Sequence, residues 1–92
     1  MCRNIRTLHH FEPPTTIEEV NAAALQYVRK ISGMARAPAE PSAHAAFETA
    51  IAQVAEATTR LLAQLPERGQ ARTREGELHK ARLRWQRREM KA

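Results

Sequence analysis

Two segments of this chain carry apolar residues at the three- and four-residue spacing of one α-helix face. The first segment covers residues 16–32 and the second covers residues 42–65. Because the connection between them is short, we expect the two helices to pack antiparallel as a hairpin. The stripes consist of Ile17, Val20, Ala24, Tyr27, Val28 and Ile31, and of Phe47, Ala50, Ile51, Val54, Thr58, Leu61, Leu62 and Leu65.

Local signals mark where both helices begin and end. The four residues from Thr16 to Glu19 have the form of a capping box, in which the Thr16 hydroxyl accepts the Glu19 amide and the Glu19 carboxylate reaches back. Gly33 stands where a left-handed residue ends a helix at no steric cost. Ser42 can cap the second helix and Pro66 stops it.

A third helix is predicted over residues 73–90, with Thr73 as its cap. Its apolar stripe is thin, since it holds only Leu78, Ala81 and Trp85. We expect this helix to dock on the others through Leu78 and Trp85 and to fray towards its end.

The expected fold class is therefore all-α. It is a small three-helix bundle, made of an antiparallel helical hairpin plus a basic C-terminal helix. Residues 1–92 form a single domain, and an N-terminal arm over residues 1–15 packs across the bundle. Chains of this size bury only roughly 60–65% of their unfolded surface, and one cysteine cannot form an internal disulfide. We therefore expect stabilisation by self-association, as a homodimer joined through apolar surface left on the first two helices.

The arm holds the only cysteine, Cys2, and two of the four histidines, His9 and His10. One hypothesis is a metal- or thiol-dependent site built on Cys2 and His9. The spacing of these residues matches no familiar zinc motif, so we favour the alternative, in which Cys2 is a small apolar side chain buried under the bundle. We expect no cofactor.

The formal net charge of +5 is confined to the end of the chain. Residues 1–66 carry six basic and six acidic side chains, whereas residues 67–92 carry nine basic and four acidic ones. An acidic protein or a nucleic acid should therefore meet the chain at its C-terminal helix, unless that face is only solvated. Nothing resembles a helix-turn-helix, so nucleic-acid binding would be nonspecific. The candidate contacts are Lys80, Arg84, Arg87 and Arg88.

The sequence contains none of the common catalytic arrangements. No paired carboxylates, glycine-rich phosphate loop or Ser-His-Asp set can be assembled, so we expect an interaction or regulatory module without catalysis. We expect neither a secretion signal nor a membrane span, because no apolar run approaches 18 residues. A lone cysteine favours a cytoplasmic location.

Three motifs occur together in this sequence: Met-Cys-Arg-Asn-Ile at residues 1–5, Phe-Glu-Pro-Pro at residues 11–14, and the stretch from Ala22 to Gly33. Together they resemble a small bacterial family catalogued as domain of unknown function 2277. The likeness is close over the first third of the chain, holds in pattern from Phe47 to Leu65, and is loose in the basic tail. The resemblance implies a compact, helical, cytosolic bacterial protein, and it supplies no catalytic residues.

Overall fold

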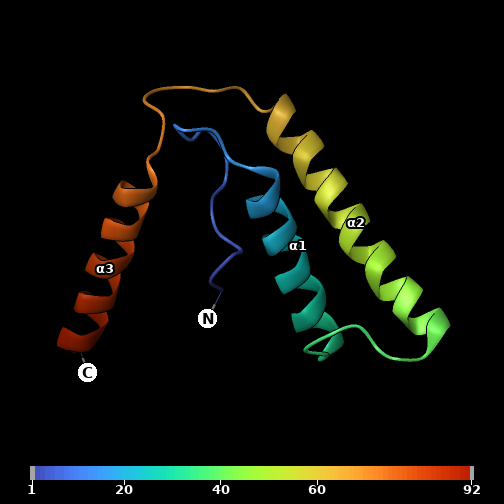
Figure 1. Ribbon diagram of the computed structural model, residues 1–92. Helices are drawn as coiled ribbons and strands as arrows, with labels where there is room; N and C mark the ends of the chain where they lie inside the picture. Colours follow the sequence, from blue (N-terminus) through green and yellow to red (C-terminus); the bar gives the residue numbers. More distant parts are fainter. Residues whose placement is uncertain (1, 92) are drawn as a thin grey trace.

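The computed structural model describes residues 2–91, which form three helices (Figure 1). They are α1 (Ile17–Ser32), α2 (Pro41–Gln64) and α3 (Arg74–Lys91). The described residues contain no strand beyond an isolated parallel β-bridge between Phe11 and Arg72. The all-α fold class is thus confirmed. No described helix is both long and apolar enough to cross a membrane.

The ends of α1 have the predicted capping chemistry. The Glu19 amide donates to the Thr16 hydroxyl at 3.2 Å, and the Thr16 amide donates to the Glu19 carboxylate at 2.9 Å. Gly33 closes the helix with a φ of 71° and donates its amide to the Arg29 carbonyl. A left-handed backbone of this kind costs glycine little, so the sequence itself terminates α1.

The start of α2 is capped differently from the prediction. Glu40, rather than Ser42, is the N-cap, and its carboxylate accepts the amides of Ser42 and Ala43 at 3.1 and 2.8 Å. Pro41 occupies the first helical position, where its fixed φ is already suitable. The helix therefore begins before Ser42, whose hydroxyl donates to Glu40 instead.

The core lies between α1, α2 and the arm. α1 and α2 pack side by side as the predicted hairpin (Figure 1). The arm runs along α1 and buries two of its own apolar side chains. The buried side chains are Leu8 and Phe11 from the arm, Val20, Ala24 and Val28 from α1, and Phe47 from α2.

α3 does not join this core. In the described part of the chain, α1 and α2 are the only helices that pack on each other, and α3 lies on the far side of the arm from α1 (Figure 1). The predicted docking through Leu78 and Trp85 is wrong, because these side chains are 54% and 50% exposed. The apolar stripe of α3 is therefore left uncovered by the other two helices.

The result is a flat molecule, 45 × 38 × 16 Å, only slightly thicker than one helix. Its radius of gyration is 16.0 Å, against about 12 Å for a compact chain of this length. Its accessible surface is 7348 Å², against about 5,400 Å² for a compact monomer of this mass. The chain therefore leaves far more surface exposed than its size requires.

Candidate functional site

The arm and the linker between α2 and α3 meet beside the start of α1. Arg72 of the linker joins them at three points. Its amide donates to the His10 carbonyl at 2.8 Å, and its carbonyl accepts the Glu12 amide at 2.9 Å. Its guanidinium donates to the His9 carbonyl at 2.7 Å. Two segments about 60 residues apart in the sequence are thus paired through backbone atoms.

Arg74, the first residue of α3, extends this junction to α1. Its Nη2 and Nε donate to the two carboxylate oxygens of Glu19 at 2.7 and 3.1 Å. The same guanidinium donates to the carbonyls of Pro13 and Pro14 at 2.7 and 3.1 Å. It also lies 5.4 Å from the centroid of the buried Phe11 ring, within the range of a cation–π contact. The planar guanidinium of an arginine can bind these acceptors together, which the ammonium group of a lysine could not do as well. Because its contacts reach both α1 and the arm, Arg74 fixes where α3 begins.

Glu19 is the anionic centre of the junction. Besides Arg74 and the capping contacts of Thr16, it accepts a hydrogen bond from Arg6 at 3.0 Å. The Arg74 hydrogen bond, followed by that of the Thr16 amide, holds the pKa of Glu19 far below its usual 4.5. The carboxylate is therefore ionised throughout the physiological pH range. Its oxygens accept hydrogen bonds from the arm, from the cap of α1 and from the start of α3.

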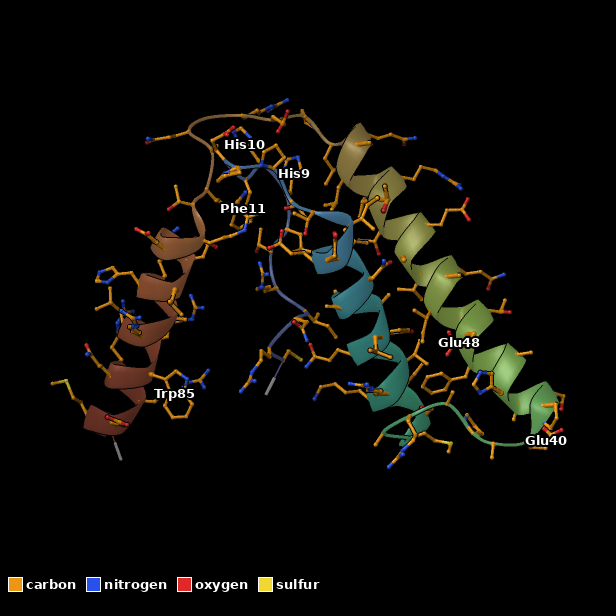
Figure 2. The ribbon with its side chains drawn as sticks, in the orientation of Figure 1. His9, His10, Phe11, Glu40, Glu48 and Trp85 are labelled. Atoms are coloured by element: carbon orange, nitrogen blue, oxygen red, sulfur yellow. The ribbon has the colours of Figure 1, made fainter. Side chains whose placement is uncertain are left out.

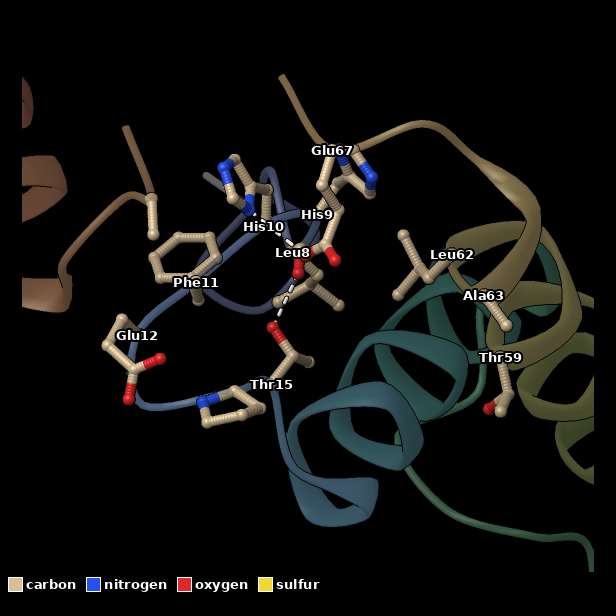
Figure 3. A pocket seen from close by; sticks show the side chains of 12 residues that line it. Leu8, His9, His10, Phe11, Glu12, Thr15, Thr59, Leu62, Ala63 and Glu67 are labelled. Atoms are coloured by element: carbon tan, nitrogen blue, oxygen red, sulfur yellow. Dashed lines mark hydrogen bonds and ion pairs between the residues drawn. The ribbon is translucent and has the colours of Figure 1, made fainter. Parts of the chain in front are cut away.

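His10 closes the other end of the junction (Figure 3). Its Nδ1 lies 3.0 Å from a Glu67 carboxylate oxygen, and its Nε2 lies 3.0 Å from the Gly69 carbonyl oxygen. Both partners can only accept, so the charged imidazolium is the form that satisfies both. The Gly69 carbonyl, followed by the Glu67 carboxylate, raises the pKa of His10 above its usual 6.5.

The His10 contact should therefore depend on pH. Because the folded pKa lies above the unfolded one, its stabilisation is complete below pH 6.5 and is lost as the pH rises through the folded value. Glu67→Gln should lower the pKa of His10. The pKa should still stay above the usual 6.5, because the hydrogen bond to the Gly69 carbonyl remains. An NMR titration of the imidazole measures this, with Glu12→Gln as the control. An unchanged His10 titration in Glu67→Gln would contradict the assignment.

An open groove of about 580 Å³ lies between the arm and the C-terminal end of α2 (Figure 3). We call it the arm groove. The His9 Nε2 atom is buried there and has no hydrogen-bond partner among the described residues. The Thr15 hydroxyl donates to the Leu8 carbonyl at 2.5 Å, so it is already engaged. A nucleophile and base within hydrogen-bond reach, the usual mark of covalent catalysis, is not present in the described arm groove. Its lining also includes Phe11, Pro14, Thr59, Leu62, Ala63 and Ala71.

Cys2 is exposed, so the prediction of a buried thiol is wrong. The amides of Asn4 and Ile5 donate to the Gln26 side chain at 2.7 and 2.9 Å. The Leu8 carbonyl accepts the Thr15 hydroxyl, which lies just before the start of α1. The arm thus runs antiparallel to α1, and this end of it is held by backbone atoms rather than by apolar burial.

The structure does not bring Cys2 and His9 together. The arm residues near each of them bind at different places: Asn4 and Ile5 bind Gln26 in the second half of α1, whereas the Leu8 carbonyl accepts from Thr15, just before α1 begins. Between residues 2 and 91, no group of three or more histidine, cysteine or carboxylate side chains is placed to hold a metal. The metal- or thiol-dependent site stays a prediction, which stoichiometric metal in the purified protein would support.

The basic side chains of α3 from Lys80 to Arg88 are exposed to solvent. Lys80 pairs with Glu77 at 3.1 Å, but Arg84, Arg87 and Arg88 have no ion-pair partner in the described structure. Trp85 projects from the side of α3 that faces the arm and α1 (Figure 2). The cations are therefore available to an acidic molecule.

Comparison with protein families places the chain. The family described as uncharacterized conserved protein, DUF2277, matches residues 1–80. The chain belongs to the DUF2277 family. No curated protein and no solved structure matches it. The resemblance seen in the arm and in α1 is thereby confirmed.

The DUF2277 match includes the whole junction, since it covers the arm, both hairpin helices, the linker and the first turns of α3. Of the predicted basic contacts, Lys80 lies within the matched span, whereas Arg84, Arg87 and Arg88 lie beyond it. The junction is thus a feature of the family-matched region, and most of the basic row is not.

Nothing local in the sequence indicates that the linker takes part in the junction. Charged residues in a linker or at the start of a helix are usually solvated, and nothing local distinguishes Glu67, Arg72 or Arg74 from such residues. Their partners are 55 to 63 residues away. The one local signal is Glu19, which the sequence marks as part of a helix cap. The structure confirms that role and adds a second one, the pairing with Arg74.

Proposed function

We propose that this protein is a non-catalytic interaction module that works as a homodimer. The observation that carries the proposal is its accessible surface of 7348 Å². This exceeds the value for a compact monomer of the same mass by about 1,900 Å². A stable protein–protein contact covers about 800 Å² of each partner, so the excess is ample for association.

Large apolar side chains contribute to this surface. Ile17 and Ile31 of α1 are 71% and 67% exposed, and Leu61 of α2 is 55% exposed. Single exposed apolar residues are ordinary, but these stand on the two helices that form the core. Covering them by a second copy would add to a core that has only six buried apolar side chains in the described chain.

The charged groups of the junction support a structural role rather than a catalytic one. Glu19, Arg72 and Arg74 are each engaged in several hydrogen bonds that hold segments together. These bonds use the donors and acceptors of the three side chains within the chain, which supports a structural role. A cytoplasmic location and a bacterial source belong to the same proposal. The exposed Cys2 thiol suits a reducing compartment, and the bacterial source rests on the family resemblance.

Thermal unfolding at different protein concentrations tests the proposal. A dimer that unfolds to monomers gains stability with concentration. We expect the Tm to rise by roughly 5–10 °C over a hundredfold increase in concentration. A Tm independent of concentration would count against self-association.

A second candidate function is nonspecific binding of nucleic acid through Lys80, Arg84, Arg87 and Arg88. It is favoured by the three arginines that lack a partner in the described structure. Four phosphate contacts on a single strand predict that log K falls with log salt with a slope of about −3. Absence of binding to a single-stranded oligonucleotide at low salt removes this candidate and leaves an acidic protein as the electrostatic partner to examine.

A further inference from the structure

We infer that α3 of each copy docks in the groove between α1 and α2 of a second copy, so that the two chains exchange their basic helices. This inference rests on the proposed self-association and names the surfaces that form it. The first surface is the apolar strip of α3, which consists of Leu78, Ala81 and Trp85. The second is a groove of about 390 Å³, called here the hairpin groove, which is lined by Ile17, Ala55, Glu56, Thr59, Arg60 and Ala63.

The hairpin groove suits an apolar helix face. Small side chains of α2, including Ala55 and Ala63, line it together with the exposed side chain of Ile17 from α1. The two charged residues beside it, Glu56 and Arg60, pair with each other. Small residues allow a helix to approach closely, and the paired charges present no net charge to it.

The strip on α3 has the matching form. Leu78, Ala81 and Trp85 follow one another at spacings of three and four, so they lie on one helix face. Leu78 and Trp85 are each about half exposed in the single chain. Arg82 and Arg88 flank the strip, and their long stems can lie along an apolar surface while their heads stay in water.

The chain cannot fill the hairpin groove with its own α3. Arg74 ties the first residue of α3 to Glu19, Pro13 and Pro14, and α3 then runs along the opposite side of the arm from α1 and α2 (Figure 1). To reach its own groove, α3 would have to break these bonds. A second copy can supply the helix with the junction intact.

Charge disfavours the other symmetric arrangement, in which two α3 helices pack on each other. Residues 74–91 carry seven basic and three acidic side chains, so two such helices would repel. Residues 17–64 carry four basic and five acidic side chains and are close to neutral. The hairpin is therefore the surface of a second copy that accepts α3 without repulsion.

The area is consistent with exchange. Reciprocal docking closes a two-fold dimer and gives each chain two equal contacts, one through its α3 and one through its hairpin groove. At about 800 Å² for each contact, the two together hide most of the surface that the single chain exposes in excess. The row of Lys80, Arg84 and Arg87 stays outside this contact.

Trp85 is the only tryptophan, so its fluorescence reports on the strip directly. As protein concentration rises through the range in which the sedimentation mass doubles, we expect its emission to shift to shorter wavelength. Trp85→Ser should remain monomeric, whereas Leu83→Ser, on another face of α3, should dimerise as the natural chain does. On the opposing surface, Ala63→Arg should abolish the dimer and Ala57→Arg, outside the groove lining, should leave it unchanged.

The outcomes separate this inference from the proposed function. A monomer at every concentration overturns both. A dimer in which Trp85 stays in water, or one that survives both Trp85→Ser and Ala63→Arg, overturns the exchange and leaves self-association standing. If the Trp85 emission of a monomer lies at short wavelength at every concentration, the strip is docked within its own chain. That result also overturns the exchange. Quenching of Trp85 in a monomer by a single-stranded oligothymidylate assigns the strip to nucleic acid and likewise overturns it.

Discussion

Phe47→Ala should lower the free energy of unfolding by about 3–5 kcal/mol. Phe47 is the one buried side chain that α2 contributes to the described core, and it is only 7% exposed. Its removal leaves a cavity in the small core formed by α1, α2 and the arm. A single core in so small a chain supplies about that much free energy in total, so the variant should be largely unfolded. Urea denaturation followed by circular dichroism measures the loss.

Glu48→Ala is the matched control, because Glu48 is the next residue on the same helix and is exposed. Its cost should stay below about 1 kcal/mol. Equal losses in the two variants would mean that the buried set of α1, α2 and the arm is not the core of the protein.

Glu19→Ala should be the most damaging change at the junction, with a cost of about 2–3 kcal/mol. About 1 kcal/mol is expected from the lost helix cap, and the rest from charged hydrogen bonds to Arg74 and Arg6. Thermal unfolding should show a fall in Tm of about 10 °C or more. Glu18→Ala, a change one residue away at an exposed position, should cost no more than about 0.5 kcal/mol.

The Glu19 contribution has a defined pH window. Because Arg74 lowers the pKa of Glu19 below 4.5, the stabilisation is fully present above that value. It is lost as the pH falls towards the folded pKa. The gap in stability between the natural chain and Glu19→Ala should therefore narrow below about pH 4.5. A gap that stays constant down to pH 2 would assign the role of Glu19 to something other than its charge.

The parts of the fold that could be predicted are those with local causes. Thr16, Glu19 and Gly33 act on their neighbours in sequence, and each has its expected role. The cap of α2 was missed because Glu40 stands before a proline and resembles an ordinary surface acid, while Ser42 is the commoner type of cap.

The junction could not be predicted, because its bonds join distant positions. Glu19 and Arg74 are 55 residues apart, and His10 and Glu67 are 57 apart. No local feature of the sequence pairs residues that lie so far apart along the chain. The same applies to the arm, where two backbone amides bind Gln26 and leave Cys2 outside.

The predicted docking of α3 is wrong because it assumes that Leu78 and Trp85 are buried within their own chain. They stay exposed because Arg74, bound to Pro13 and Glu19, directs α3 away from α1 and α2. What Leu78 and Trp85 indicate is a need for burial, and a second copy can meet that need.

Sedimentation equilibrium over a concentration series tests the central claim most directly. The exposed surface and the separate α3 predict a species of twice the 10.4 kDa chain mass, dissociating on dilution. A mass of 10.4 kDa at every concentration up to the millimolar range would contradict the account.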